Sequence, residues 1–441
     1  MVSIEMIHRK VVSGLSSPLI KRRNALLVIL LAAATVVALL LLNRFDPSET
    51  EAISTSESLT DQQVDGPKAE EAVIPIEQTS APEEEKEGAL PEPSVQTDIP
   101  SLAETYAEYF PIGAAVEPLQ TTGLKSELLK KHVNWLVAEN VMKPDAMQPS
   151  EGSFNWENAD RIVKFAKESG MEVRFHTLVW HSQVGAWFFK DADGKPMVDE
   201  TDPGKRETNK KLLLERLDTH VRTIVGRFKD DIQSWDVVNE VIEPGDPGGM
   251  RASDWYKITG TDYIETAFRA AREAGGPDAK LYINDYGTDN PVKRDRLYEL
   301  VKEMLDNGVP IDGVGHQTHI GIHGPTVDSI IDSMQKFSEL GLDNLVTELD
   351  MSIYAWNDRR DFGADIPADV LKKQADRYRE LFEAFKANKD ILSGVVFWGI
   401  ADDHTWLSSF PVKRTEAPFL FDKQLQAKPA FWAVVDPSKL P

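Results

Sequence analysis

Residues 234–240 read SWDVVNE, and residues 344–350 read NLVTELD. Each stretch is a β-type apolar run that leads into a glutamate, Glu240 in the first and Glu348 in the second. A single glutamate is most often an exposed surface charge. Both of these follow runs that are too apolar for a surface strand, so we expect both at the ends of buried strands.

Similar apolar runs alternate with amphipathic helical patterns from about residue 106 onward. We expect strands at 110–115, 135–138, 172–177, 232–238, 281–284, 313–317, 344–348 and 394–398. We expect helices at 159–169, 210–228, 263–274, 294–307, 327–340 and 370–386. This α/β alternation predicts a (β/α)8 TIM barrel. An open doubly wound sheet is the alternative, but the chain lacks the Gly-x-Gly-x-x-Gly turn of its dinucleotide-binding form.

Residues 25–42 contain no charged side chain and are long enough to cross a bilayer as a helix. Only one basic residue, Arg44, follows this run soon after its end. Five basic residues precede it: Arg9, Lys10, Lys21, Arg22 and Arg23. By the positive-inside rule, residues 1–24 are cytoplasmic, 25–42 form a transmembrane signal anchor, and the rest of the chain is extracytoplasmic. A secretory signal peptide is the alternative, and its cleavage would release a secreted protein.

Residues 43–104 are rich in Glu, Ser, Thr and Pro, a composition that predicts a disordered acidic linker ahead of a catalytic barrel at 105–441. The formal net charge of −23 argues against a nucleic-acid partner, because binding to phosphates depends on basic surface. The chain has no cysteine, which excludes disulfides and zinc–thiolate sites.

The two glutamates suit one kind of chemistry. In parallel barrels, catalytic residues come from the carboxyl ends of the strands. Glu240 closes the fourth expected strand and Glu348 the seventh, so their carboxylates can face each other across the barrel mouth. Cleavage of a glycosidic bond requires one protonated and one ionised carboxyl group. The pair therefore predicts a glycoside hydrolase.

Four ordered motifs resemble those of family 10 glycoside hydrolases, chiefly endo-β-1,4-xylanases: HTLVWH at 176–181, WDVVNE at 235–240, GHQTH at 315–319 and TELD at 347–350. Further matching positions extend the resemblance over residues 105–437. The resemblance implies a retaining endo-1,4-β-xylanase that cuts internal bonds of xylan and xylo-oligosaccharides, with Glu240 as acid/base and Glu348 as nucleophile. Two alternatives remain, another β-1,4-glycanase and a non-catalytic surface barrel that binds polysaccharide.

The resemblance also implies a set of substrate-binding residues: Glu139, Asn140, Lys143, His176, Trp180, Gln183, Asn239, Tyr286, Gln317, His319, Trp398 and Trp406. His319 and Asp350 would in addition support Glu348. A solvated surface position is the alternative for Lys143, and a core position is the alternative for the two last tryptophans. Pro144 stands where the family often has tryptophan.

We expect no metal and no cofactor. His176 and His181 are five residues apart, and His316 and His319 are three apart, so on a strand the members of each pair point to opposite faces. There is no His-Glu-x-x-His motif. We expect the catalytic domain to be monomeric.

Overall fold

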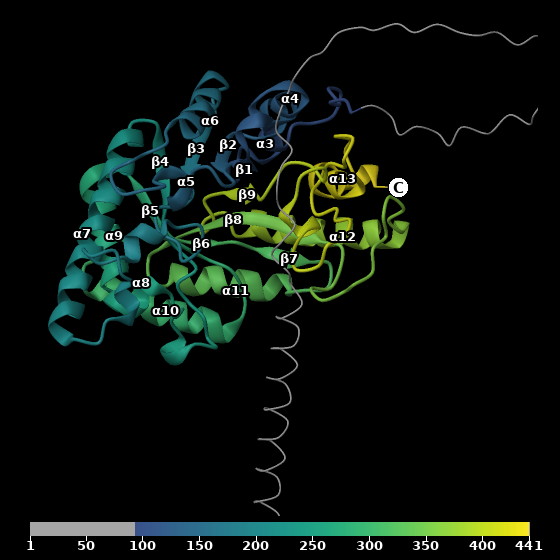
Figure 1. Ribbon diagram of the computed structural model, residues 1–441. Coiled ribbons are helices and arrows are strands. Elements are labelled where there is room, and N and C mark those ends of the chain that lie inside the picture. Colours follow the sequence, from purple (N-terminus) through teal and green to yellow (C-terminus); the bar gives the residue numbers. More distant parts are fainter. Residues whose placement is uncertain (1–92, 441) are drawn as a thin grey trace, which may run out of the picture. The chain divides into compact units, whose positions relative to one another are not determined.

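The computed structural model describes residues 93–440, and its strands close into a parallel barrel within a ring of helices (Figure 1). The barrel strands are β1 (Ile112–Val116), β2 (Trp135–Ala138), β3 (Glu172–Phe175), β4 (Ile232–Asn239), β5 (Lys280–Asp285), β6 (Gly313–His316), β8 (Asp343–Ser352) and β9 (Val395–Phe397). Neighbours pair in parallel in this order, and β9 pairs with β1 to close the ring. A short strand, β7 (His319–Gly321), pairs with the end of β8. The predicted TIM barrel is confirmed.

Most helices of the described chain begin at polar caps or prolines. They are α3 (Leu102–Tyr106), α4 (Gly123–His132), α5 (Pro144–Met147), α6 (Glu157–Glu168), α7 (Pro203–Phe228), α8 (Asp254–Thr259), α9 (Asp262–Gly275), α10 (Pro291–Asp306), α11 (Val327–Ser338), α12 (Ala368–Ala387) and α13 (Pro429–Val435). The α7 helix begins earlier than the predicted 210. Its Asp202 cap accepts a hydrogen bond from the Lys205 backbone N–H at 2.9 Å, and Pro203 fits the first helical position.

Apolar side chains fill two layers. The larger layer lies between the strands and the surrounding helices and includes Trp235, which stacks on Phe175 with ring centroids 5.1 Å apart. A smaller cluster forms on the opposite strand faces, inside the barrel: Ala115, Val137, Val396 and Trp398. Trp135 packs against this cluster, where Gly113 and Gly394 leave room for it, since a β-carbon at either position would come within 3.0 Å of the Trp135 side chain.

The described chain contacts the barrel before the predicted linker boundary at residue 104. The Ser94 N–H donates to the Gln424 carbonyl at 3.3 Å, and Leu102 is buried. The expected anchor at 25–42 and linker residues 43–92 lie outside the described residues. Within residues 93–440, no helix is both long enough and apolar enough to cross a membrane.

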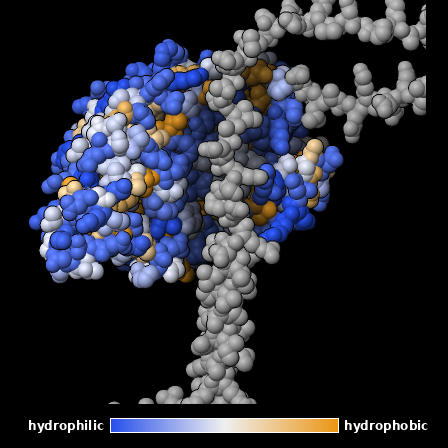
Figure 2. All heavy atoms as spheres, viewed as in Figure 1, coloured by the Kyte–Doolittle hydropathy of each residue, from blue (hydrophilic) through white to orange (hydrophobic). Residues whose placement is uncertain are grey.

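The visible barrel surface is mostly hydrophilic, with hydrophobic residues scattered singly or in small groups (Figure 2). Trp356 and Phe410 are two large hydrophobic side chains that are exposed to solvent, with exposed fractions of 52% and 55%. Both lie in loops at the carboxyl end of the barrel, Trp356 after β8 and Phe410 after β9. These two side chains line the cleft described next.

Candidate active site

A cleft of about 970 Å³ opens where the strands end. It is lined by both predicted catalytic glutamates and by every predicted substrate-binding residue: Glu139, Asn140, Lys143, His176, Trp180, Gln183, Asn239, Glu240, Tyr286, Gln317, His319, Glu348, Trp398 and Trp406. Asp350 does not line this cleft and contacts His319 from behind. The fold therefore brings together residues that are up to 267 positions apart, from Glu139 to Trp406.

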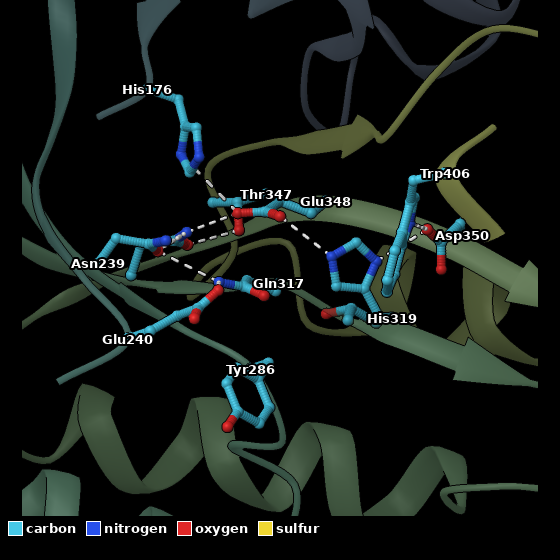
Figure 3. A network of polar contacts seen from close by, with 12 residues as sticks. His176, Asn239, Glu240, Tyr286, Gln317, His319, Thr347, Glu348, Asp350 and Trp406 are labelled. Atoms are coloured by element: carbon cyan, nitrogen blue, oxygen red, sulfur yellow. Dashed lines mark hydrogen bonds and ion pairs between the residues drawn. The ribbon is translucent and has the colours of Figure 1, made fainter. Parts of the chain in front are cut away.

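The carboxylate of Glu348 on β8 is buried and hydrogen-bonded through both oxygens (Figure 3). Oε1 accepts from Asn284 Nδ2 at 2.7 Å, and Oε2 lies 3.0 Å from His319 Nε2. Burial by itself raises the pKa of Glu348, but the nearby His176 ring, His319 and the Asn284 amide together lower this pKa to about 2. Glu348 is therefore an ionised carboxylate at any pH well above 2.

His319 bridges two carboxylates. Its Nδ1 lies 2.8 Å from Asp350 Oδ2, and Trp406 Nε1 donates to the same oxygen at 2.8 Å. Burial lowers the pKa of His319, but the charges of Asp350 and Glu348 and the hydrogen bonds to them outweigh burial and raise this pKa to about 10. The ring is thus an imidazolium that donates to both carboxylates. These two contacts are the ones that His319 and Asp350 need in order to hold Glu348 in place and keep it ionised.

Two more of the histidines weighed as metal ligands, His176 and His316, have separate partners. His176 Nδ1 lies 3.0 Å from Asp236 Oδ2. His316 contacts Thr288 Oγ1 at 2.8 Å through Nδ1 and Asn344 Oδ1 at 2.9 Å through Nε2. Among residues 93–440, no group of three histidine, aspartate or glutamate side chains is arranged to hold a metal ion.

Glu240 follows β4 directly and has a positive φ of 58°, which is uncommon for a residue with a β-carbon. Its N–H donates to the Asn284 carbonyl at 2.8 Å. Gln317 Nε2 donates to Oε1 at 3.1 Å, and His181 Nδ1 lies 3.9 Å from Oε2. The Glu240 side chain is 15% exposed, against 6% for Glu348, so Glu240 is the more open of the two carboxyl groups.

Asn284 on β5 connects the two glutamates and was not among the predicted site residues. Its Nδ2 donates to Asn239 Oδ1 at 2.8 Å as well as to Glu348, and its Oδ1 accepts from Thr347 Oγ1 at 2.7 Å. Gly315 on β6 leaves room for this contact, because a β-carbon there would lie 2.9 Å from Thr347 Cγ2 and closer still to Asn284 Oδ1. The amide of Asn284 is thereby fixed in one orientation.

Lys143 and its partners line the cleft together. Lys143 Nζ donates to Asn140 Oδ1 at 2.8 Å and to Gln183 Oε1 at 2.9 Å, and it lies 4.9 Å from the centre of the Trp180 ring. Burial lowers the pKa of Lys143, although the surrounding carboxylates, Glu348 first among them, act to raise it. Lys143 is only 7% exposed, so it is not a solvated surface lysine.

Aromatic side chains form another part of the cleft lining. Trp398 and His176 form a T-shaped pair with ring centroids 5.1 Å apart, and Trp406 stacks on Phe410 with ring centroids 5.7 Å apart. Trp356 lies 6.4 Å from Trp406, between ring centroids. Trp398 belongs to the interior cluster and also lines the cleft, so it combines the two positions that the sequence presented as alternatives.

Residues 101–437 match the family model of glycosyl hydrolase family 10. The chain belongs to this family. A thermostable celloxylanase of Thermoclostridium stercorarium is 68% identical over 343 residues, which cover 78% of this chain and 89% of that protein. Endo-1,4-beta-xylanase A of Halalkalibacterium halodurans is 57% identical over 345 residues, with coverage of 77% and 87%. The crystal structure of xylanase B from Clostridium stercorarium F9 is 69% identical, with a TM-score of 0.76, and covers 77% of this chain and 100% of that one.

The family 10 resemblance is thereby confirmed, and the structure shows two further residues, His404 and Glu117, that contact cleft residues from outside the cleft lining. His404 Nε2 lies 2.6 Å from Glu139 Oε2, and Glu117 Oε1 accepts from Asn140 Nδ2 at 2.7 Å. Pro144 is buried at the start of α5 and does not line the cleft. The loop positions of His404 and Glu117 gave no periodic signal that could have identified them.

Proposed function

We propose that this protein is a retaining endo-1,4-β-xylanase in which Glu348 is the nucleophile and Glu240 the acid/base. The observation that carries the assignment is the contrast between two carboxyl groups of one cleft. Glu348 is buried and fixed by His319 and Asn284 as an anion. Glu240 is more exposed and receives one hydrogen bond to its carboxyl group, from Gln317. An anchored anion suits nucleophilic attack, and a freer carboxyl group suits proton transfer to and from substrate.

In the first step, the Glu348 carboxylate attacks the anomeric carbon of the xylosyl unit, and the glycosidic C–O bond breaks. Glu240 gives its proton to the departing sugar oxygen. A covalent xylosyl–enzyme ester forms on Glu348, and its negative charge is consumed.

In the second step, a water molecule attacks the same anomeric carbon from the side that the leaving sugar vacated. Glu240, now a carboxylate, takes one proton from this water, and the C–O bond to Glu348 breaks. Two inversions give net retention, and both glutamates return to their starting protonation states.

The residues around the glutamates would bind the xylan chain. Lys143, Asn140 and Gln183 present a charged and polar surface for hydroxyl groups in the cleft. Asn239, next to Glu240, would hydrogen-bond the sugar 2-hydroxyl, a contact that strengthens in the transition state. Trp180, Tyr286, Trp398 and Trp406 offer ring faces on which the C–H faces of sugars pack.

A measurement of reducing-sugar release from xylan and from carboxymethyl cellulose tests this function. We expect strong release from xylan, loss of that release in Glu348→Gln, and no loss in the exposed control Glu339→Gln. Binding to xylan without cleavage would support the non-catalytic alternative. The cellulose derivative tests activity on a β-1,4-glucan, which the name of the celloxylanase relative suggests. Cleavage of that polymer alone would contradict the assignment to xylan.

For the cellular location, we propose that residues 25–42 anchor the protein in the membrane, with residues 1–24 inside and the barrel outside. The uncharged run and the basic residues before it support this proposal. Intact protein should sediment with membranes and be released by detergent but not by high salt. A secreted product that lacks residues 1–42 would show instead that the segment is a cleaved signal peptide.

A further inference from the structure

The loop after Glu240 folds back on itself. Gly248 and Gly249 have φ values of 75° and 71°, a conformation that glycine adopts without steric cost. Ile242 forms an antiparallel bridge with Met250, and the Arg251 N–H donates to the Val241 carbonyl at 2.9 Å. The turn therefore returns Arg251, eleven positions later, to the backbone beside Glu240.

Arg251 holds the Glu240 main chain on one side, and Asn284 holds it on the other. Arg251 Nε donates to the Glu240 carbonyl at 2.7 Å, while the Glu240 N–H donates to the Asn284 carbonyl at 2.8 Å. The left-handed backbone of Glu240 is unfavourable for a residue with a β-carbon and persists only where its surroundings hold it. A charge-assisted hydrogen bond from a guanidinium is well suited to this purpose.

The same guanidinium reaches the wall of the cleft. Arg251 Nη2 donates to Tyr286 Oη at 2.8 Å, and Tyr286 Oη donates in turn to Glu243 Oε2 at 3.1 Å. Glu240 and Tyr286 line the cleft, whereas Arg251 does not and is only 17% exposed. Arg251 contacts these two cleft residues directly and can act on a bound sugar through them.

We propose that Arg251 is a positioning residue for proton transfer by Glu240, an inference that rests on the proposed acid/base role of Glu240. By fixing the Glu240 carbonyl, Arg251 sets the direction in which the side chain leaves the backbone, and so the distance from the carboxyl group to the leaving oxygen. Misplacement of a reacting group by about 1 Å can reduce a rate about 100-fold. Arg251 thus serves the acid step and leaves nucleophilic attack by Glu348 largely unaffected.

Two substrates separate these effects. Xylohexaose has a sugar leaving group that must be protonated, whereas dinitrophenyl β-xylobioside has a leaving group that departs without a proton. For Arg251→Ala, we expect kcat/KM for xylohexaose to fall by about 10- to 100-fold, while kcat/KM for the activated substrate changes by less than about threefold. Arg251→Lys keeps a charged donor and should recover part of the loss, whereas Arg251→Gln should recover less.

The matched control is Arg272→Ala. Arg272 also donates to backbone carbonyls, those of Gly276 and Ala279 at 3.1 and 2.6 Å, but before β5 begins at Lys280, at the opposite end of that strand from the cleft. Its loss should lower the melting temperature without changing the ratio of the two kcat/KM values. Tyr286→Phe, which removes the hydroxyl contact alone, shows how much of the Arg251 effect passes through that wall residue.

An equal fall of kcat/KM for both substrates in Arg251→Ala would overturn the proposal and assign Arg251 to stability alone. Unchanged values for both would overturn it as well. If the alanine variant does not fold, the lysine and glutamine variants supply the same comparison. Failure of the proposed function would differ from all of these, because the wild-type protein itself would not cleave xylohexaose.

Discussion

Replacement of His319 by glutamine should weaken the hold on the nucleophile without removing it. Glutamine can still donate a hydrogen bond to Glu348, but it carries no charge. In the wild-type protein, the imidazolium lies 3.0 Å from Glu348 Oε2 and 2.8 Å from Asp350 Oδ2. The substitution therefore removes the cation from between two buried carboxylates.

The size of the effect follows from this geometry. An opposite charge at such a distance lowers the pKa of a carboxyl group by about 1 to 3 pH units. Each pH unit corresponds to about 1.4 kcal/mol. Without His319, the pKa of Glu348 should rise from about 2 to between about 3 and 5. The nucleophile would then lose activity in mildly acid solution.

The assay is the pH dependence of kcat/KM for dinitrophenyl β-xylobioside, because this substrate needs no acid and its acidic limb reports the nucleophile. The acidic limb should move to higher pH in His319→Gln. The double variant His319→Gln with Asp350→Asn should move less, because it also removes the second buried negative charge. An acidic limb that stays within about 0.3 pH units of the wild type would refute the electrostatic role of His319.

Three further outcomes are expected. The Glu348–His319 pair should stabilise the fold most between pH 4.5 and 6.5: stabilisation from Glu348 is lost as pH falls from 4.5 toward about 2, and stabilisation from His319 is lost as pH rises from 6.5 toward about 10. Urea unfolding at a series of pH values measures this dependence. It would be contradicted if the free energy of unfolding of the wild type varied with pH as little as that of the His319→Gln, Asp350→Asn double variant. Gly315→Ala should displace Asn284, lowering the free energy of unfolding by about 1–3 kcal/mol and kcat/KM by at least about tenfold. Wild-type values in calorimetry and kinetics would show that the neighbouring side chains can move to accommodate the added methyl group. Lys143→Met should raise KM for xylohexaose by about tenfold or more with little change in melting temperature, because it removes the buried cation and the charged hydrogen bonds that Lys143 would donate to a bound sugar. An unchanged KM would exclude Lys143 from substrate binding.

The barrel strands were predictable because buried parallel strands leave continuous apolar runs, and runs such as 135–138 coincide with the observed β2. The β7 strand was not predicted, because it has only three residues and forms by pairing with the end of β8, a contact that depends on the folded structure. The first turns of α7, from Pro203, are polar and exposed, so apolar periodicity could not show them.

The candidate site was predictable where side chains belong to ordered motifs, as for Glu240 and Glu348. It was not predictable where a residue acts through a neighbour that only the fold supplies. Asn284 lies in a motif at 282–286, yet its role as a bridge appears only when β4, β5 and β8 come together. Arg251 likewise reaches Glu240 through a glycine turn whose direction no periodic pattern encodes.

The central claim is that Glu348 is the nucleophile, and trapping of the covalent intermediate tests it most directly. A dinitrophenyl xylobioside with fluorine in place of the 2-hydroxyl should inactivate the protein, because the fluorine slows both formation and breakdown of the ester, whereas the good leaving group speeds formation alone. Mass spectrometry of the digested protein should then locate one fluoroxylobiosyl group on the peptide that contains Glu348, and Glu348→Gln should remain unlabelled. A label on Glu240, or steady turnover without any labelled protein, would contradict the account.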